Sequence, residues 1–276
     1  MSTRCKLAAV ASLILLFSTA GTAGTPANAP NHTLVFGVVP QQPAEKLAQV
    51  WNPFLKYLGE KTGRSIKFES APNIDAFNKR TANGDFDLVY MNPLYYTVVH
   101  QSVGYQVFAK EKDILLKGIL VVRKNSPYQK LADLAGITIA FPDAKAFAAT
   151  LLPLHEFKTQ GINITPIYIG SHEGVYNNVA RGLHVAGGGV AKTLAQTDSI
   201  VRDELRVLWS SDSYTSHPFA HHPRVDPAVI EQMAKIMFNL DQDEHGKRLL
   251  KELRFRGFIA AQDQEYEKLN LLSQQQ

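Results

Sequence analysis

The chain has one cysteine in 276 residues, Cys5, and it lies in a segment typical of a cleavable secretory signal. That segment, Met1 to Ala23, has a basic start, an apolar run from Leu7 to Phe17, and small residues before an expected cleavage after Ala20 or Ala23. The mature chain therefore has no cysteine, which excludes disulfides, cysteine nucleophiles and thiolate metal sites.

Basic clusters and membrane-spanning runs are also lacking. Removing the signal takes Arg4 and Lys6, so 29 − 2 = 27 basic residues face 25 acidic ones and the formal charge falls from +4 to +2. No run of lysines and arginines interleaved with aromatics follows, so the sequence predicts no nucleic-acid partner. No later segment is apolar enough to span a bilayer. We therefore expect a soluble protein outside the cytoplasm.

The motifs of common enzymes are lacking as well. The triple glycine 187–189 is not followed by the Lys-Ser/Thr of a phosphate loop, and no nucleophile elbow is present. Three histidines in the stretch Tyr214–Pro223 would suit a metal site only on a helix, and two prolines oppose a helix there. We interpret these residues, His217, His221 and His222, as solvated loop histidines. The sequence predicts no enzyme, cofactor or metal, and a secreted metal-dependent hydrolase is the least favoured function.

The stretch 137–189 predicts an alternation of strands and helices. Ile137–Phe141 is a β-branched apolar run, Asp143 is placed to cap a helix, and 144–157 has helical composition. The pattern then repeats with a strand at Ile167–Ile169, and ends on the glycine-rich strand after His184. Such an alternation is typical of a parallel α/β unit.

The second helix of this stretch carries the most informative residues. Ser171 is expected to cap a helix that runs from His172 to about Arg181. Because the carboxyl ends of parallel strands meet at one sheet edge, both helix N-termini should face one crevice. Amide-rich N-termini favour an anionic ligand, and an imidazole in the first turn would project toward it. Ser171, His172 and Asp143 are therefore candidate ligand-binding residues, although Asp143 and Ser171 could be ordinary helix caps.

An earlier block predicts a second α/β unit with its own site residues. Strands are expected at Thr33–Val39, Ser65–Glu69 and 85–90, and a helix at Glu45–Glu60 should be interrupted or bent near Pro53. Asn92 should cap the helix that follows the third strand. Aromatic neighbours accompany this cap, so three residues are candidate ligand contacts from this block: Tyr90, Asn92 and Tyr95. Tyr95 and the adjacent Tyr96 could instead pack against a neighbouring helix.

The two blocks predict an α/β protein of two lobes. We expect residues 32–118 plus 211–276 to form the first lobe and residues 119–210 the second. Strands near 115–122 and 205–209 would cross between the lobes and form the hinge. A single continuous sheet without a hinge is the alternative.

The mature chain resembles the phosphate, phosphite and phosphonate periplasmic substrate-binding proteins of ABC transporters. The resemblance rests on FGVVPQQPAEKLAQVWNPFLKYLGEKTG, NGDFDLVYMNPLYY, KGILVVRKNSP and above all YIGSHEGVYNNVARG. In that family a histidine at the position of His172 contacts the bound oxyanion. The resemblance implies a two-lobed type II binding protein that closes over a small anionic ligand and delivers it to a membrane permease. The same fold would serve a ligand-sensing periplasmic partner of a membrane signalling protein, and in either role we expect a monomer.

The chain departs from the family pattern where the ligand is bound. Ala146-Phe147-Ala148 replaces a Ser-Thr-Ser run, Val185 replaces an aspartate, and Ile74 replaces an aromatic residue. Losing these hydroxyl groups removes oxyanion donors. We therefore expect a ligand whose organic portion packs on Phe147 and the tyrosines, or an oxyanion held partly by Lys145, and weak binding of inorganic phosphate. Alternatively, Phe147 points into the core.

Overall fold

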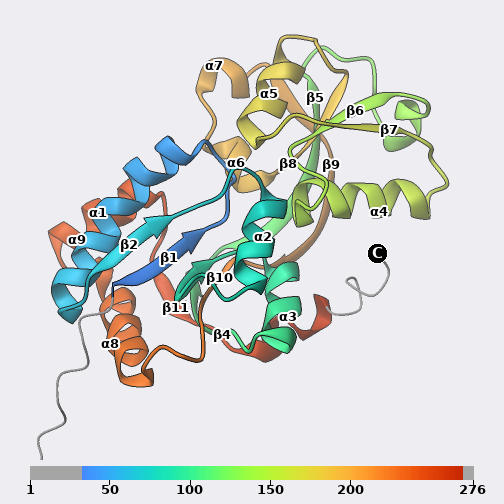
Figure 1. Cartoon of the computed structure of the whole chain (residues 1–276). Helices are drawn as coiled ribbons and strands as arrows, with labels where there is room; N and C mark the ends of the chain where they lie inside the picture. Colours follow the sequence, from blue (N-terminus) through green and yellow to red (C-terminus); the bar gives the residue numbers. More distant parts are fainter. Residues whose placement is uncertain (1–32, 270–276) are drawn as a thin grey trace, which may run out of the picture. The chain divides into compact units, whose positions relative to one another are not determined.

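A computed structural model describes residues 33–269, which contain a six-stranded and a five-stranded sheet flanked by helices (Figure 1). The predicted signal, Met1 to Ala23, lies outside the described residues. Within the described part of the chain, no helix is both long and apolar enough to cross a membrane.

The first sheet combines parallel and antiparallel strands in the order β11-β4-β10-β3-β1-β2. Its strands are β1 (Leu34–Val38), β2 (Ile66–Glu69), β3 (Leu88–Tyr90), β4 (Gln106–Glu111), β10 (Pro218–His221) and β11 (Phe258–Ala260). The flanking helices are α1 (Ala44–Thr62), α2 (Ile74–Ala82), α3 (Pro93–Ser102), α8 (Pro227–Phe238) and α9 (Glu244–Leu253). The helix α1 runs uninterrupted through Pro53, so the expected interruption was wrong.

The second sheet has the order β7-β6-β8-β5-β9. Its strands are β5 (Leu115–Arg123), β6 (Thr138–Phe141), β7 (Thr165–Tyr168), β8 (Ala186–Val190) and β9 (Leu205–Thr215). Its helices are α4 (Leu152–Thr159), α5 (His172–Ala180), α6 (Ala191–Ala195) and α7 (Ser199–Arg202). Short 3-10 turns lie at Leu131–Leu134, Leu240–Gln242, Asp263–Glu265 and Glu267–Leu269.

The chain passes between the two sheets twice. Residues 112–114 connect β4 to β5, and residues 216–217 connect β9 to β10. The predicted two-lobed α/β fold is therefore confirmed, and a single continuous sheet is not what forms. The described chain from residue 33 onward belongs to one compact unit, so the exact lobe boundaries at 118/119 and 210/211 stay a prediction.

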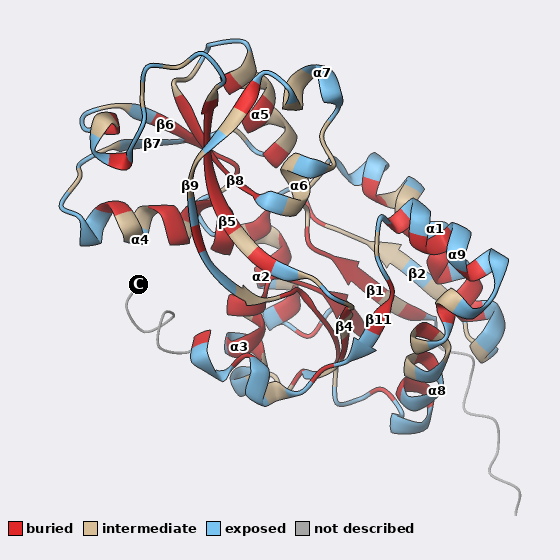
Figure 2. Cartoon of the chain, turned by 180° about the vertical axis from the view of Figure 1, so that it is seen from behind, coloured by how far each residue is buried: buried red, intermediate tan, exposed pale blue. Residues whose placement is uncertain are grey.

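Buried residues are concentrated in both sheets (Figure 2). The strand β5 is covered on both faces, because Ile119 and Val121 pack with α5 in one cluster whereas Leu120 and Val122 pack in another. Such two-sided burial explains why this segment is a continuous apolar run rather than an alternating one.

One predicted helix start was wrong. Asp143 does not cap a helix from residue 144; its Oδ1 accepts a hydrogen bond from the Lys145 N–H at 2.8 Å. Residues Phe147–Leu151 form a π-helical turn, and α4 begins only at Leu152. Pro153 lies in the first turn of α4 and supplies no N–H to a carbonyl of the preceding turn, which favours a break there.

The stretch Tyr214–Pro223, which we expected to be irregular, contains a central strand. Its residues 218–221 form β10, which pairs antiparallel with both β3 and β4 and is buried along its length. Pro218 is the first residue of the strand, a position where a missing N–H is tolerated. The interpretation of His217 and His221 as solvated was wrong, because their exposed fractions are 7% and 8%.

Candidate ligand-binding site

Three cavities lie among elements of the two sheets. The small cavity, of about 20 Å³, is lined by Val39, Gln41, Ile74, Asn92, Leu116, Ala146, Phe147, Ala148, Ala149, His172, Val190 and His217. The aromatic cavity, of about 90 Å³, shares Gln41 and His217 with it and extends to Trp51, Tyr90 and Phe255. The outer cavity, of about 430 Å³, shares His172 with the small one.

His172 is positioned by the start of α5. The Ser171 Oγ accepts a hydrogen bond from the Gly174 N–H at 3.0 Å, which fixes the first turn. The imidazole is 4% exposed, and its Nδ1 lies 3.5 Å from the Thr193 Oγ1. Burial lowers the pKa of His172 to about 4, so the ring is neutral at physiological pH. A neutral buried imidazole at a helix N-terminus is ready to donate one hydrogen bond to an anion.

A second helix N-terminus reaches the small cavity from the first sheet. The Asn92 Oδ1 accepts a hydrogen bond from the Tyr95 N–H at 2.8 Å, as the predicted cap requires. Asn92 itself is 7% exposed and lines the cavity. The two caps predicted for α3 and α5 are therefore present, and their elements contribute residues to the same space.

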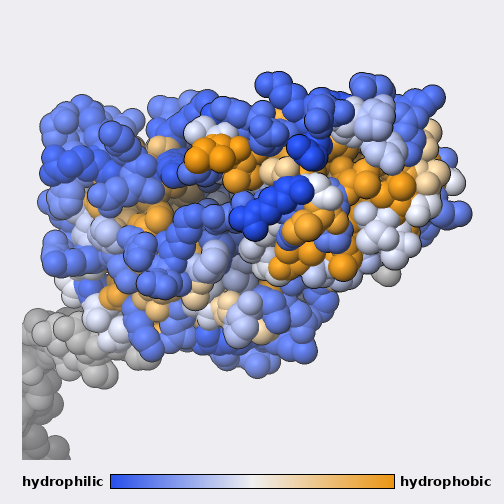
Figure 3. Space-filling view, turned by 90° about the horizontal axis from the view of Figure 1, so that it is seen from above, coloured by the Kyte–Doolittle hydropathy of each residue, from blue (hydrophilic) through white to orange (hydrophobic). Residues whose placement is uncertain are grey.

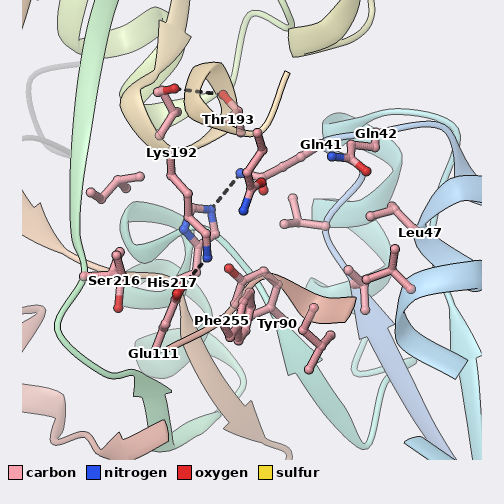
Figure 4. A pocket seen from close by; sticks show the side chains of 18 of the residues that line it. Gln41, Gln42, Leu47, Tyr90, Glu111, Lys192, Thr193, Ser216, His217 and Phe255 are labelled. Carbon is pink, nitrogen blue, oxygen red and sulfur yellow. Dashed lines mark hydrogen bonds and ion pairs between the residues drawn. The ribbon is translucent and has the colours of Figure 1, made fainter. Parts of the chain in front are cut away.

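His217 lies between β9 and β10 and lines both the small and the aromatic cavity. Its Nε2 is 3.0 Å from the Gln41 Nε2, and its ring stacks on Tyr90 with centroids 5.2 Å apart (Figure 4). Burial, followed by the charges of Lys192 and His172, lowers the pKa of His217 to about 3. Sequence reasoning missed this residue because nothing in its neighbourhood distinguished it from His221.

The turn that replaces the Ser-Thr-Ser run borders the small cavity with apolar groups. Phe147 is 2% exposed and packs edge-on against Tyr214, with ring centroids 5.3 Å apart. It belongs to the same core cluster as the first sheet and also lines the small cavity. Phe147 is thus part of the core, and packing of a ligand against it stays a prediction.

The aromatic cavity contains a buried ion pair. Glu111, at the end of β4, is 3% exposed, and its Oε2 pairs with the Lys192 ammonium of α6 (Figure 4). The ammonium also lies 4.0 Å from the centroid of the Phe255 ring. Burial raises the pKa of Glu111 and lowers that of Lys192. The Glu111 Oε1 has no hydrogen-bond partner among the described residues.

The model for ABC-transporter phosphonate periplasmic substrate-binding proteins matches residues 36–266. The chain belongs to this family. Proteins of this family are substrate-binding components of importers rather than enzymes, so a small ligand and a membrane permease are its partners. The family's location is periplasmic or extracellular. The resemblance seen in the sequence is confirmed.

One sequence relative and two solved structures resemble the chain along most of its length. The chain is 22% identical over 273 residues to the phosphate-import protein PhnD of Mycolicibacterium smegmatis, covering 86% of this chain and 82% of that one. PhnD1 of Prochlorococcus marinus, in complex with methylphosphonate, has a TM-score of 0.80 and 19% sequence identity. The match covers 88% of this chain and 97% of that one. A binding protein of a Pseudomonas aeruginosa phosphonate transporter has a TM-score of 0.78 and 18% sequence identity. The match covers 88% of this chain and 86% of that one.

The seven candidate site residues predicted from the sequence do not all line the same cavity. His172 and Asn92 line the small cavity, and Tyr90 lines the aromatic one. Four residues line none of the three cavities: Ser171, Asp143, Lys145 and Tyr95. Ser171 acts as the cap of α5, and the Tyr95 hydroxyl donates to the Asn78 carbonyl at 2.7 Å. The binding roles of all seven stay predictions.

Lys145 joins the lobes instead. Its ammonium pairs with Asp75 of α2, and this contact lowers the pKa of Asp75 to about 2. A second bridge links Lys46 of α1 to Glu173 of α5 at 2.9 Å. Exposed ion pairs of this kind contribute little to stability, so they suit contacts that open and close.

Hydrophilic residues cover much of the face in Figure 3, whereas apolar ones gather toward its right-hand part.

No group of three or more histidine, cysteine, aspartate or glutamate side chains that could hold a metal occurs within residues 33–269. Of the three buried histidines among these residues, His172 and His217 line the cavities described above, whereas His221 lines none of them.

Proposed function

We propose that this chain is the periplasmic component that binds a phosphonate, or another oxyanion with an organic group, and delivers it to the permease of an ABC importer. The observation that carries the proposal is the small cavity, where His172 and the N-terminal turns of α3 and α5 come together. Helix N-termini and an imidazole are donors suited to oxyanion oxygens.

The residues around this cavity are the reason to expect an organic group on the ligand. Alanine and phenylalanine side chains replace hydroxyl donors at residues 146–148, so fewer hydrogen bonds are available to a bare tetrahedral anion. The adjoining aromatic cavity offers Trp51, Tyr90 and Phe255, and it shares His217 with the small one. A ligand with its oxyanion in the first cavity and its substituent in the second uses both.

The names of the relatives leave two ligand classes to distinguish. One relative is a phosphate-import protein, and another was solved with methylphosphonate. For this chain we favour the phosphonate class, because residues 146–148 offer no hydroxyl to a fourth oxygen and the aromatic cavity can take an organic group. Inorganic phosphate, which lacks an apolar group to bury, gains nothing from the aromatic cavity.

Closure of the two lobes over the ligand is the expected binding step. The Lys46–Glu173 and Lys145–Asp75 pairs join elements of different sheets and would form only when the lobes approach. Small-angle scattering with and without ligand tests closure, and a smaller radius of gyration is expected at saturation. An identical scattering profile would argue against a hinge.

We further propose that residues 1–23 direct export and that the mature protein acts as a monomer in the periplasm. Mass spectrometry of periplasmic extract measures the mature N-terminus, which should follow Ala20 or Ala23. A full-length N-terminus in that extract would contradict this assignment.

Delivery is tested by uptake. A thermal-shift panel of oxyanions identifies the tightest ligand, and cells lacking this chain are then assayed for uptake of its radiolabelled form. The proposal predicts lost uptake, which the wild-type chain restores and a His172→Ala chain restores poorly. Normal uptake with a changed transcriptional response to the same ligand would favour the sensing role.

A further inference from the structure

The small cavity has no permanent positive charge on its walls. Among the described residues that line it, the histidines His172 and His217 are the only side chains able to become cationic. Lys192 lines the adjoining aromatic cavity and is already paired with Glu111. An anion entering the small cavity would therefore be buried without a compensating charge unless an imidazole gains a proton.

The hydrogen bond between His217 and Gln41 sets the protonation state of the His217 ring. The Gln41 side-chain nitrogen can only donate, so the Nε2 of His217 at 3.0 Å accepts and carries no proton. The ring is neutral in this arrangement. Protonation of Nε2 would require the Gln41 side chain to move away from the ring, which leaves the new N–H free to donate to a ligand.

The surroundings of His217 explain why the proton is absent without an anion. The ring stacks on Tyr90, which is buried and uncharged. Burial opposes an imidazolium there most strongly, and the positive charge of Lys192 opposes it further. The titratable groups that line a cavity with His217 come from several elements: Tyr90 of β3, Glu111 of β4, His172 of α5 and Lys192 of α6. A bound anion would reverse this balance because it attracts the imidazolium directly.

We propose that His217 is a second oxyanion-binding side chain beside His172, and that it binds the ligand as an imidazolium whose proton is taken up from solvent during binding. This inference rests on the proposed function and adds to it the residue that supplies the missing charge. The proton balance is simple: neutral His217, one proton from the buffer and the anion give a hydrogen-bonded imidazolium–anion pair. Affinity therefore rises as the pH falls.

Calorimetry in buffers of different ionisation enthalpy measures the proton uptake. Methylphosphonate is titrated at about pH 6, where free His217 and its replacement are both neutral and an imidazolium paired with the anion holds its proton. The wild-type chain should take up roughly one proton more per ligand than the His217→Gln variant, because glutamine donates a hydrogen bond without gaining charge. Ligand protonation contributes equally to both chains and cancels in the difference. The variant should also bind about tenfold more weakly.

The matched control is His221→Gln, since His221 is equally buried, lies four residues away and lines none of the three cavities. It should leave both proton uptake and affinity as in the wild type. Equal proton uptake by the wild type and the His217 variant, or unchanged affinity of that variant, overturns the inference while leaving the proposed function intact. Failure of the wild type to bind any oxyanion of the panel would overturn both.

Discussion

Glu111 of β4, which is buried, and Lys192 of α6, which is partly exposed, form an ion pair between elements of the two different sheets. Removing one partner leaves an uncompensated charge, which costs about 3 to 5 kcal/mol in buried pairs. We expect Lys192→Met to lower the free energy of unfolding by an amount of this order, because it leaves the buried Glu111 unpaired. Glu111→Gln should lower it less, because the Lys192 side chain is 24% exposed and can be hydrated.

The double variant separates pairing from simple loss of packing. Glu111→Gln with Lys192→Met should be less destabilised than the sum of the single changes by about 1 to 3 kcal/mol. Urea unfolding of the four chains measures the coupling. Strictly additive losses would show that the pair is not coupled in solution.

Replacing His172 tests its role in binding. His172→Ala should weaken methylphosphonate binding by about 1 to 3 kcal/mol, because a hydrogen bond to a charged oxygen is lost. The exposed His155 of α4 provides a control, and His155→Ala should bind normally. Retained affinity in the His172 variant would place the ligand elsewhere.

The buried histidines also make stability depend on pH. The pKa of His172 falls from 6.5 to about 4 on folding, and that of His217 to about 3. Because the unfolded chain binds these protons first, the stability is fully present above about pH 6.5 and is lost as the pH falls toward 4. Each histidine contributes on the order of 3 kcal/mol over this window.

Urea unfolding at about pH 7 and about pH 5 measures this dependence. The His172→Gln and His217→Gln variants should lose less stability between the two pH values than the wild type does. A wild-type loss matched by both variants would mean that other groups control the acid response.

The missing hydroxyls can be restored at two positions. Ala146 and Ala148 line the small cavity, and serines there would add oxyanion donors with little added volume. We expect Ala146→Ser with Ala148→Ser to raise the affinity for inorganic phosphate about tenfold. Calorimetry compares this double variant with Ala144→Ser, a control at an exposed residue that should not change phosphate binding. No gain in the double variant would mean that these side chains do not face the anion.

The parts of the site that could be predicted are local in sequence. Ser171 caps α5 through Gly174, and Asn92 caps α3 through Tyr95, each across three residues. A motif within one turn specifies such contacts, and the α/β alternation specified the two-lobed fold.

The parts that could not be predicted depend on distant residues. Glu111 and Lys192 are 81 positions apart, and Gln41 and His217 are 176 apart. No local pattern encodes such pairs, because the crossing segments bring them together. The strand β10 was missed since its alternation is obscured by proline and histidine, although its burial between β3 and β4 stabilises it.

The ligand's organic group is the central claim, and comparative calorimetry tests it most directly. Phosphate, phosphite, methylphosphonate and butylphosphonate are titrated into the same preparation under one set of conditions. Each added methylene that enters the aromatic cavity should contribute up to about 0.8 kcal/mol, so butylphosphonate should bind tightest and phosphate weakest. Tight binding of phosphate, with the phosphonates binding more weakly, would contradict the account.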